Sequence, residues 1–402
     1  MTKSKYFSLI LILGSLTALG PFSIDMYLPA FPIIAKDLHT TTEQVAISLS
    51  SFFIGISLGQ LLYGPLLDRF GRKKPLVIGL TLYILASVGC VFATSLNQLI
   101  VLRVIQALGS CSAAVASVAM VRDLFPVKDS AKVFALLMLV VGVSPMLAPT
   151  VGSYVTILFG WHAIFIMLLV LGVLNLLATI LWLPDHYKPD TSISLMPGPI
   201  TKTFLSVIAE PYFYTYALTG AMAFSGLFAY VAGSPVVFME VFKVSTEAYG
   251  WIFAILSIGL IGSSQINSIL VKRHRSETIV LFALSCQVLL TLIFFAGAYY
   301  GWFNLYQTIG LLFIFLSCLG FISPNTSALS LSPFKKNAGS ASALMGAIQM
   351  GVGALAASIL SLFSTKSAVP MVSVMACSSV LALFILLSGR IRIKSTAIKR
   401  TI

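Results

Sequence analysis

Charged side chains are scarce in this chain of 402 residues. Only 9% of its residues are charged, against roughly 25% in soluble domains, and just 12 of them are acidic. Hydrophobic residues make up 58% of the sequence, and the mean hydropathy is +1.00. This composition excludes a soluble globular domain and predicts an integral membrane protein.

The chain also has few residues from which a catalytic or metal centre could be built. Its four histidines fall in or near predicted loops. There is no Walker sequence, no haem or zinc spacing and no Ser/His/Asp arrangement. The cysteines are singly spaced within apolar runs, without a disulfide or metal pattern: Cys90, Cys111, Cys286, Cys318 and Cys377. We therefore expect no enzyme, no cofactor and no bound metal.

Apolar runs of about 20 residues recur along the whole sequence, each long enough to cross a hydrocarbon core of about 30 Å. They are too long for barrel strands and do not alternate apolar with polar residues. The sequence predicts an all-α polytopic membrane protein with twelve spans: 7–30, 44–66, 75–94, 97–120, 131–158, 161–183, 211–238, 248–271, 277–300, 304–329, 338–363 and 368–390.

The net charge of +13 follows the membrane and does not indicate nucleic acid. With a cytoplasmic N-terminus, twenty-one of the 25 basic residues fall in cytoplasmic segments, while outer segments hold only Lys36, Lys243 and Lys366. Such a bias sets orientation, so both termini are predicted to be cytoplasmic and the basic face to contact membrane lipid. A cleaved signal peptide is the alternative for the N-terminus, but its removal would leave eleven spans and disrupt this alternation.

A long polar interruption separates six spans from six. It predicts an N-terminal bundle over residues 1–183, a cytoplasmic linker over 184–210 rich in Pro, Ser and Thr, and a C-terminal bundle over 211–402 that ends in a basic tail. Two such halves are typical of a carrier with its substrate path between repeats. A sensor or scaffold that transports nothing is the alternative, which the lack of a soluble signalling domain disfavours.

Two charges lie well inside the predicted spans. Asp25 stands in "PFSIDMYLPAFP", Pro21 to Pro32, and Arg103 opens "RVIQALGS" in the fourth span. Ionised groups are costly in lipid, so each needs water or a partner. At 1.5 Å per residue, Asp25 is expected roughly 6 to 10 Å and Arg103 roughly 9 Å below the outer ends of their spans. The alternative for Arg103 is that its side chain snorkels to the surface.

The loop between spans two and three reads "GPLLDRFGRKKP", Gly64 to Pro75. One interpretation is a basic anchor with a turn, but that does not require an acid at one fixed place. The loop resembles the signature of the major facilitator superfamily: Gly, three residues, Asp-Arg, one residue, Gly-Arg, then Lys or Arg. The resemblance implies a cytoplasmic gate made by Asp68, Arg69, Gly71 and Arg72, with Arg122 as a partner of Asp68.

Three further stretches resemble the bicyclomycin-resistance (Bcr/CflA) subfamily of drug:proton antiporters: "PFSIDMYLPAFP", "VRDLFP" from Val121 and "AGSASALMGAIQMGVGA" from Ala338. Span five resembles the kink motif of drug exporters through Pro145, Pro149 and Gly152, although two of its glycines are replaced. Tight packing of small residues explains the same stretch equally well.

The resemblance implies a carrier of the bacterial inner membrane that exports drugs or other small organic compounds in exchange for protons by alternating access. Asp25 is then the expected proton-coupling residue and Arg103 its partner or relay neighbour, since spans one and four line the central path in this fold. A narrow metabolite exporter or a proton symporter remains the alternative. The expected partners are substrate, protons and lipid, and we expect a monomer.

The substrate cavity is the least determined part of this prediction. Aromatic residues in spans more often face lipid or the core, and one sequence does not orient its helices. Aromatic and amide side chains with one acid would suit bulky, weakly polar compounds. The candidates for the cavity are Tyr27, Gln106, Phe224, Phe228, Asn325 and Gln349.

Overall fold

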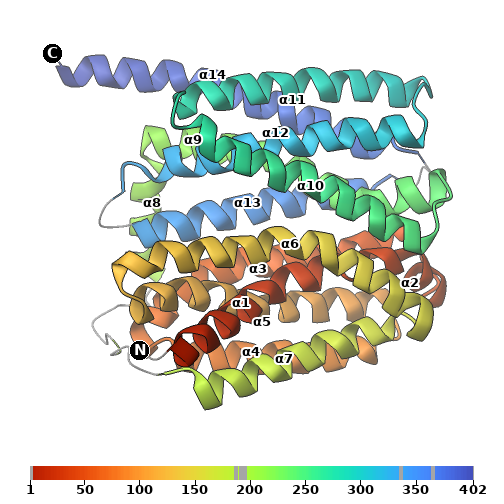
Figure 1. Cartoon of the computed structure of the whole chain (residues 1–402). Helices are drawn as coiled ribbons and strands as arrows, with labels where there is room; N and C mark the ends of the chain where they lie inside the picture. The colour runs from red at the N-terminus through yellow and green to blue at the C-terminus, as the bar shows by residue number, and fades with distance from the viewer. Residues whose placement is uncertain (1–2, 185–188, 190–196, 335–337, 364–366, 402) are drawn as a thin grey trace. The chain divides into compact units, whose positions relative to one another are not determined.

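The structure, a computed structural model, describes residues 3–184, 189, 197–334, 338–363 and 367–401, and these residues form helices joined by short connections (Figure 1). Twelve of the helical segments are long and apolar enough to cross a membrane, so the predicted all-α fold with twelve spans is confirmed. The α-helices are α1 (Lys3–Asp25), α2 (Phe31–Asp37), α3 (Thr42–Phe70), α4 (Lys73–Val91), α5 (Leu96–Leu124), α6 (Val127–Phe159), α7 (His162–Trp182), α8 (Pro197–Ile208), α9 (Pro211–Pro235), α10 (Thr246–Leu270), α11 (Ser276–Tyr299), α12 (Leu305–Leu331), α13 (Ala338–Leu360) and α14 (Val369–Thr401).

The first span is longer and more broken than its sequence predicts. After α1 ends at Asp25, a 3-10 segment (Leu28–Ala30) leads into α2, and the span continues to Asp37. Pro29 and Pro32 have no backbone N–H to donate, which favours this change of hydrogen bonding over an uninterrupted α-helix. The chain therefore continues as helix beyond residue 30, where the sequence predicted the end of this span, and the depth of Asp25 stays a prediction.

Local signals in the sequence mark several helix starts. The side chains of Thr41 and Ser95 accept hydrogen bonds from the third residue after them, at the starts of α3 and α5. Asn304 and Gln307 form a reciprocal capping box at the start of α12. These bonds satisfy backbone N–H groups that a helix start otherwise leaves without partners.

Residues 1–196 and 245–254 form one compact unit, called unit 1. Within it α5 packs against α3 and α4, α4 against α7, and α1 against α5 and α6. The buried interior combines Leu, Phe and Tyr with many serines, most of which donate to a carbonyl in their own helix. Unit 1 therefore has a polar network inside an apolar bundle, and this network surrounds Arg103.

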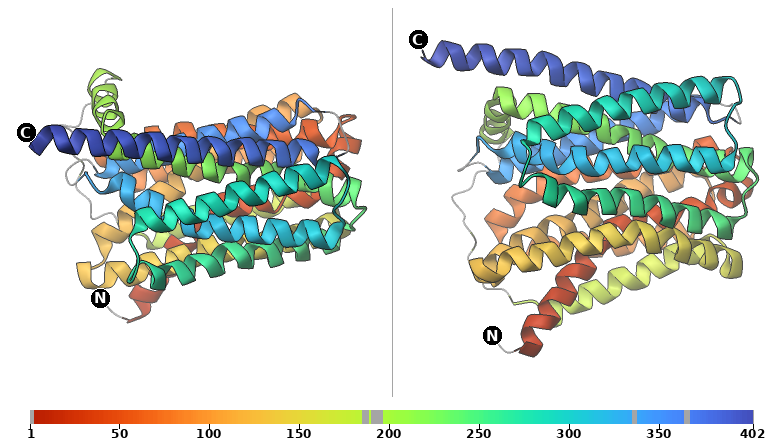
Figure 2. Two further views of the ribbon diagram at one scale, coloured as in Figure 1. Left: turned by 90° about the horizontal axis from the view of Figure 1, so that it is seen from above. Right: turned by 45° about the horizontal axis from the view of Figure 1, so that its top comes forward.

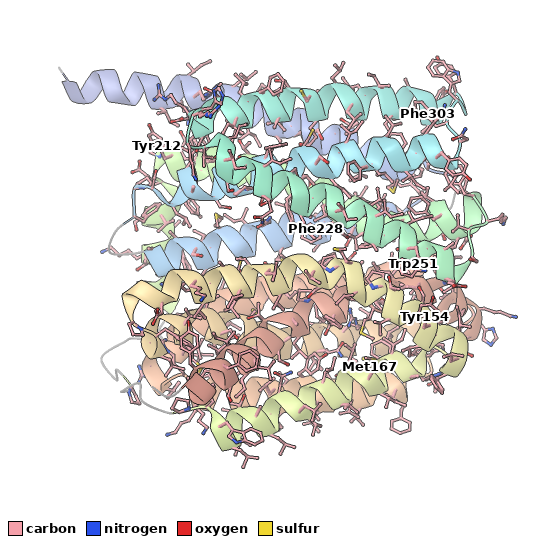
Figure 3. All side chains as sticks on the ribbon, in the orientation of Figure 1. Tyr154, Met167, Tyr212, Phe228, Trp251 and Phe303 are labelled. Atoms are coloured by element: carbon pink, nitrogen blue, oxygen red, sulfur yellow. The ribbon has the colours of Figure 1, made fainter. Side chains whose placement is uncertain are left out.

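Residues 197–244 and 255–402 form a second compact unit, called unit 2. Here α9 is the central helix, because α12, α13 and α14 all pack on it, and α11 packs on α12 and α14 (Figure 2). A π-helical segment, Val236–Val241, continues α9. Side chains such as Phe228 fill the spaces between these helices (Figure 3).

The predicted linker, 184–210, lies partly outside the described residues, which omit 185–188 and 190–196. Its second half is not an irregular loop, because α8 (Pro197–Ile208) occupies it and packs against α13 and α9. The apolar residues Leu205 and Val207 that follow "PGPITK" support a helix where Pro and Ser content suggested a loop.

Candidate functional site

Arg103 is fully buried in unit 1, which excludes snorkelling of its side chain. Its guanidinium donates to the backbone carbonyl of Ser23, N···O 2.8 Å, and to Gln106 Oε1, N···O 2.6 Å. The guanidinium carbon also lies 4.1 Å from the ring centre of Phe52 and 4.6 Å from that of Tyr27. Ring faces attract a cation, so these contacts offset part of the cost of burying the charge.

The groups around Arg103 extend into a buried polar network that the sequence did not predict. Gln106 donates to Ser87 Oγ at 2.8 Å, and Ser87 donates to the carbonyl of Tyr83 at 2.7 Å. The hydroxyl of Tyr83 lies 2.8 Å from Ser23 Oγ, which links α4 to α1. Serines within apolar helices were the sequence feature that could have indicated this network, but a single sequence does not show which way their side chains face.

Tyr27 and Gln106 belong to this network. Both are fully buried, with the Tyr27 hydroxyl bonded to Ser48 Oγ and its ring against Phe31 and Phe165. Their polar atoms are therefore bonded to protein groups around Arg103 in this structure, and their expected place in the substrate cavity stays a prediction.

Asp25 lies at the break between α1 and the 3-10 segment and is 6% exposed. Among the described residues no ion pair joins it to Arg103, so the structure does not bring the two together as a salt bridge. Arg103 instead holds the carbonyl of Ser23, two residues before Asp25. The Nε of Arg103 has no hydrogen-bond partner among the described residues.

Gly152, predicted as part of a kink in α6, has a definite packing role beside Asp25. A Cβ at residue 152 would collide with the backbone carbonyl group of Met26, the residue after Asp25. Pro149 and Pro145 lie in the same helix, about one and two turns earlier, respectively. Because Gly152 has no side chain, α6 can contact the backbone of the first span where its α-helix breaks.

The signature loop forms a second cluster of charges in unit 1. Arg72 pairs with Asp68 at 2.5 Å and with Asp123 at 2.7 Å, and the Arg72 side chain is only 12% exposed. Partial burial alone would lower the pKa of Arg72, but the hydrogen bonds and charges of Asp123 and Asp68 raise it above its ordinary value. Arg72 thus ties the start of α4 to the ends of α3 and α5.

The partner expected for Asp68 was not the one observed. Arg122 is exposed and forms no ion pair among the described residues, while its neighbour Asp123 binds Arg72. Arg69 lies 5.8 Å from the ring centre of Phe70, and Gly71 makes the turn with a φ of 86°, which other residues rarely adopt. Asp123, and not its neighbour Arg122, lies on the side of α5 that faces Arg72. The loop motif alone does not show which of these two residues lies on that side.

Lys73 adds a contact that sequence reasoning missed. Its ammonium donates to the carbonyls of Ile180 and Leu183, at 2.9 and 3.1 Å. These carbonyls lie at the end of α7, where a cation is favoured by the helix dipole. The basic loop therefore also fastens α4 to α7.

In unit 2 the predicted cavity residues have different surroundings. Asn325 is buried and donates to Asn267 Oδ1 at 2.7 Å, so it joins α12 to α10. Phe228 is buried, while Phe224 is half-exposed, and their rings meet edge to face at 5.4 Å. Asn267 was missed because one amide in an apolar helix gives no sign of its direction.

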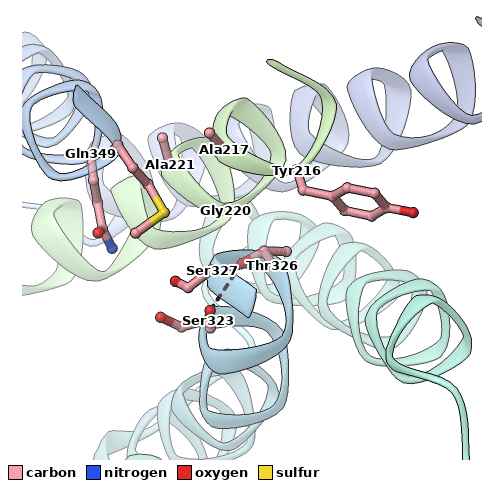
Figure 4. A pocket seen from close by; sticks show the side chains of 9 residues that line it. Tyr216, Ala217, Gly220, Ala221, Ser323, Thr326, Ser327 and Gln349 are labelled. Atoms are coloured by element: carbon pink, nitrogen blue, oxygen red, sulfur yellow. Dashed lines mark hydrogen bonds between the residues drawn. The ribbon is translucent and has the colours of Figure 1, made fainter. Parts of the chain in front are cut away.

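Gln349 lines a recess in unit 2. The recess is partly open, has a cavity volume of about 10 Å³, which is room for about one water-sized group, and lies between α9, α12 and α13 (Figure 4). Ser323, Ser327 and Met345 share its wall. Within the described ranges, no three His, Cys, Asp or Glu residues are grouped so that they could hold a metal ion.

Residues 13–358 match the Major Facilitator Superfamily. The chain belongs to this superfamily. It is also 33% identical to a bicyclomycin resistance protein homolog of Haemophilus influenzae, with 96% of this chain and 98% of the relative covered. A chloramphenicol resistance protein of Pseudomonas aeruginosa is 27% identical over 90% of this chain and 86% of its own. The resemblance to the bicyclomycin-resistance subfamily is thus confirmed.

Solved structures of this superfamily share the fold. A D-xylose-proton symporter superposes with a TM-score of 0.71 at 15% identity, over 94% of this chain and 97% of its own. Identity this low supports the fold alone. The major facilitator chain described here is therefore a multi-pass transporter of small molecules and not an enzyme, because that is what its superfamily comprises.

Proposed function

We propose that this major facilitator protein exports drugs or other small organic compounds in exchange for protons. The observation that carries the proposal is a buried carboxyl group, Asp25, at a helix break beside the turn that Arg103 grips. Two relatives that cover most of the chain are named for antibiotic resistance, which supports export of such compounds.

The surroundings of Asp25 and Arg103 support the proposed proton coupling. A buried carboxylate is costly unless a cation or water compensates its charge, and no cation pairs with Asp25 among the described residues. Arg103 meanwhile uses a neutral carbonyl, an amide and aromatic rings. Among the residues that the structure describes, Arg103 has no anionic partner. Release of the proton from Asp25 would create a carboxylate that can attract Arg103, so protonation and deprotonation of Asp25 would change the hydrogen-bond partners of Arg103.

The cluster of Asp68, Arg72 and Asp123 serves as the cytoplasmic gate in this proposal, with Arg69 and Gly71 shaping the loop. Its bonds join three helices of unit 1 at the end that the basic residues predict to be cytoplasmic. Alternating access rocks the two halves, 1–183 and 211–402, against each other, and in this proposal the cluster keeps the cytoplasmic ends of α3, α4 and α5 in the arrangement that the gate needs. Pro145, Pro149 and Gly152 would let α6 follow the break near Asp25.

The setting proposed for the protein is the bacterial inner membrane, with both termini in the cytoplasm, membrane lipid around the spans and a monomeric carrier. The excess of basic residues in the segments between alternate spans supports this orientation. Tyr27, Gln106, Phe224, Phe228, Asn325 and Gln349 remain candidates for contact with substrate, and of these Tyr27, Gln106 and Asn325 would first have to give up their present hydrogen bonds.

Transport by purified protein in liposomes tests the proposal. Vesicles are loaded with chloramphenicol or another candidate drug, and a pH gradient is imposed with a protonophore as control. We expect drug movement against its gradient that stops when the protonophore collapses the pH difference. Drug flux indifferent to the gradient would exclude proton coupling, and transport of one metabolite without competition by drugs would favour the narrow-specificity alternative.

A further inference from the structure

The recess in unit 2 is built from hydrogen-bonding groups and has no charged residue in its wall. Ser323 and Ser327 lie one turn apart on α12, so their side chains share one helix face. Gln349 reaches the same space from α13. Figure 4 shows both serine hydroxyls pointing toward the side on which Gln349 lies, while the Tyr216 ring points away.

These polar groups differ from their neighbours in how they are bonded. The hydroxyl of Thr326 donates to the carbonyl of Ile322 at 2.9 Å, and that of Ser330 to the carbonyl of Ser327 at 2.9 Å. In the described part of the chain, the hydroxyls of Ser323 and Ser327 and the amide of Gln349 have no protein hydrogen-bond partner. These three side chains are half-buried and line the recess, so they are free to form hydrogen bonds with a ligand that enters it.

The chemistry of a matching guest follows from what the recess contains. Hydroxyl and amide groups both donate and accept hydrogen bonds. An ionic group would find no counter-charge, since the acidic and basic residues of the unit 2 spans stand near the span ends, as Glu240, Glu277 and Arg390 do. Met345 supplies an apolar, adaptable wall.

We propose that Ser323, Ser327 and Gln349 form a subsite for an uncharged hydroxyl or amide group of the transported compound. The inference rests on the proposed export of small organic compounds and adds a substrate class to it. The buried acid and base of the described spans, Asp25 and Arg103, lie in unit 1. Proton handling and recognition of neutral polar groups are thereby assigned to different units of one carrier.

Equilibrium binding to the purified full-length protein, without any pH gradient, tests this subsite. The probes are chloramphenicol, an uncharged amide with two hydroxyls, and its 1,3-di-O-acetylated derivative, which lacks both hydroxyl donors. We expect Ser323→Ala, Ser327→Ala and Gln349→Leu each to weaken chloramphenicol binding by about 2- to 10-fold, the usual range for one neutral hydrogen bond. At least one of these variants should also lose the preference for chloramphenicol over the acetylated probe.

Two controls keep the test specific. Ser317→Ala lies on the same helix, where the native hydroxyl already donates to the carbonyl of Phe313 at 2.8 Å, so its binding should equal that of the wild type. Tetraphenylphosphonium has no hydrogen-bonding group, so its binding should be unchanged in all variants.

The subsite proposal is overturned if the wild type does not distinguish the two chloramphenicol probes, or if the three variants bind them as Ser317→Ala does. Because no gradient is used, this outcome is separate from a failure of proton-coupled export, which appears only in flux. A carrier with the predicted binding but no gradient-driven flux would keep the subsite and lose the proposed coupling.

Discussion

At the scale of single residues, Arg103 shows what the sequence reveals and what it does not. From the sequence, an acid and a base inside apolar spans could be predicted to lie at a similar depth in the membrane. In the structure, Arg103 donates a hydrogen bond to the carbonyl of Ser23, two residues before Asp25. Their direct pairing could not be predicted, because the direction of a side chain depends on neighbours far away in sequence, here Phe52 on α3 and Ser87 on α4.

Replacement of Arg103 by lysine should destabilise unit 1. A lysine has a single ammonium in place of the planar fork that now reaches Ser23 and Gln106 at once. Loss of a hydrogen bond to a charged group costs about 1.5–3 kcal/mol, so we expect a clearly lower midpoint of thermal unfolding in detergent. Arg122 is an exposed arginine on the same helix, so Arg122→Lys is the matched control and should unfold at the same temperature as the wild type. Equal midpoints for both variants would contradict the assigned role of the fork.

At the scale of helices, the twelve spans were predictable because length and hydropathy decide them, whereas their breaks were not. The proline-containing stretch after Asp25 was assigned to the end of a span, yet the chain continues through α2 to Asp37. Backbone contact with α6 fixes this break, and that contact depends on a glycine more than a hundred residues away. The partner of Asp68 eluded prediction for a similar reason.

Gly152→Ala should loosen the packing of α6 on the first span. The added methyl group would meet the carbonyl of Met26, and a backbone atom has little freedom to retreat. Overpacking of this kind costs about 1–3 kcal/mol. We expect lower thermal stability and slower transport, while Gly20→Ala, where the added Cβ has open space, should have little effect. If Gly152→Ala were as stable as the wild type, the close contact of α6 with Met26 would not be needed for stability, which would contradict this prediction.

Charge removal in the signature loop should affect transport more than stability. Asp68 is 45% exposed and Asp123 25% exposed, and such ion pairs contribute about 0.2–1 kcal/mol each. We expect Asp68→Asn and Asp123→Asn to reduce drug flux several-fold with little change in unfolding temperature, because the gate bonds set the balance between states. Arg122→Gln should transport normally, and a loss equal to that of Asp123→Asn would place Arg122 in the gate after all.

At the scale of the whole molecule, composition predicted a membrane protein, the twelve apolar runs in two halves predicted a polytopic carrier, and the signature loop predicted its superfamily. The division into bundles at 183 and 211 and the orientation in the membrane remain predictions. Orientation is testable by cysteine labelling from outside intact cells with a membrane-impermeant maleimide. We expect Lys243→Cys, in a predicted outer loop, to be labelled and Lys202→Cys, in the predicted cytoplasmic linker, to stay unlabelled until the cells are lysed. The reverse pattern would invert the topology.

The central claim is that Asp25 carries the coupled proton. Its most direct test compares Asp25→Asn with the wild type in liposomes, by drug uptake driven by an imposed pH gradient and by drug exchange without a gradient. The control is Asp37→Asn, at the far end of the same span, where the carboxylate accepts a hydrogen bond from Trp161 at 2.8 Å. We predict that Asp25→Asn loses gradient-driven uptake but keeps exchange, and that Asp37→Asn keeps both. Undiminished gradient-driven uptake by Asp25→Asn would contradict the account.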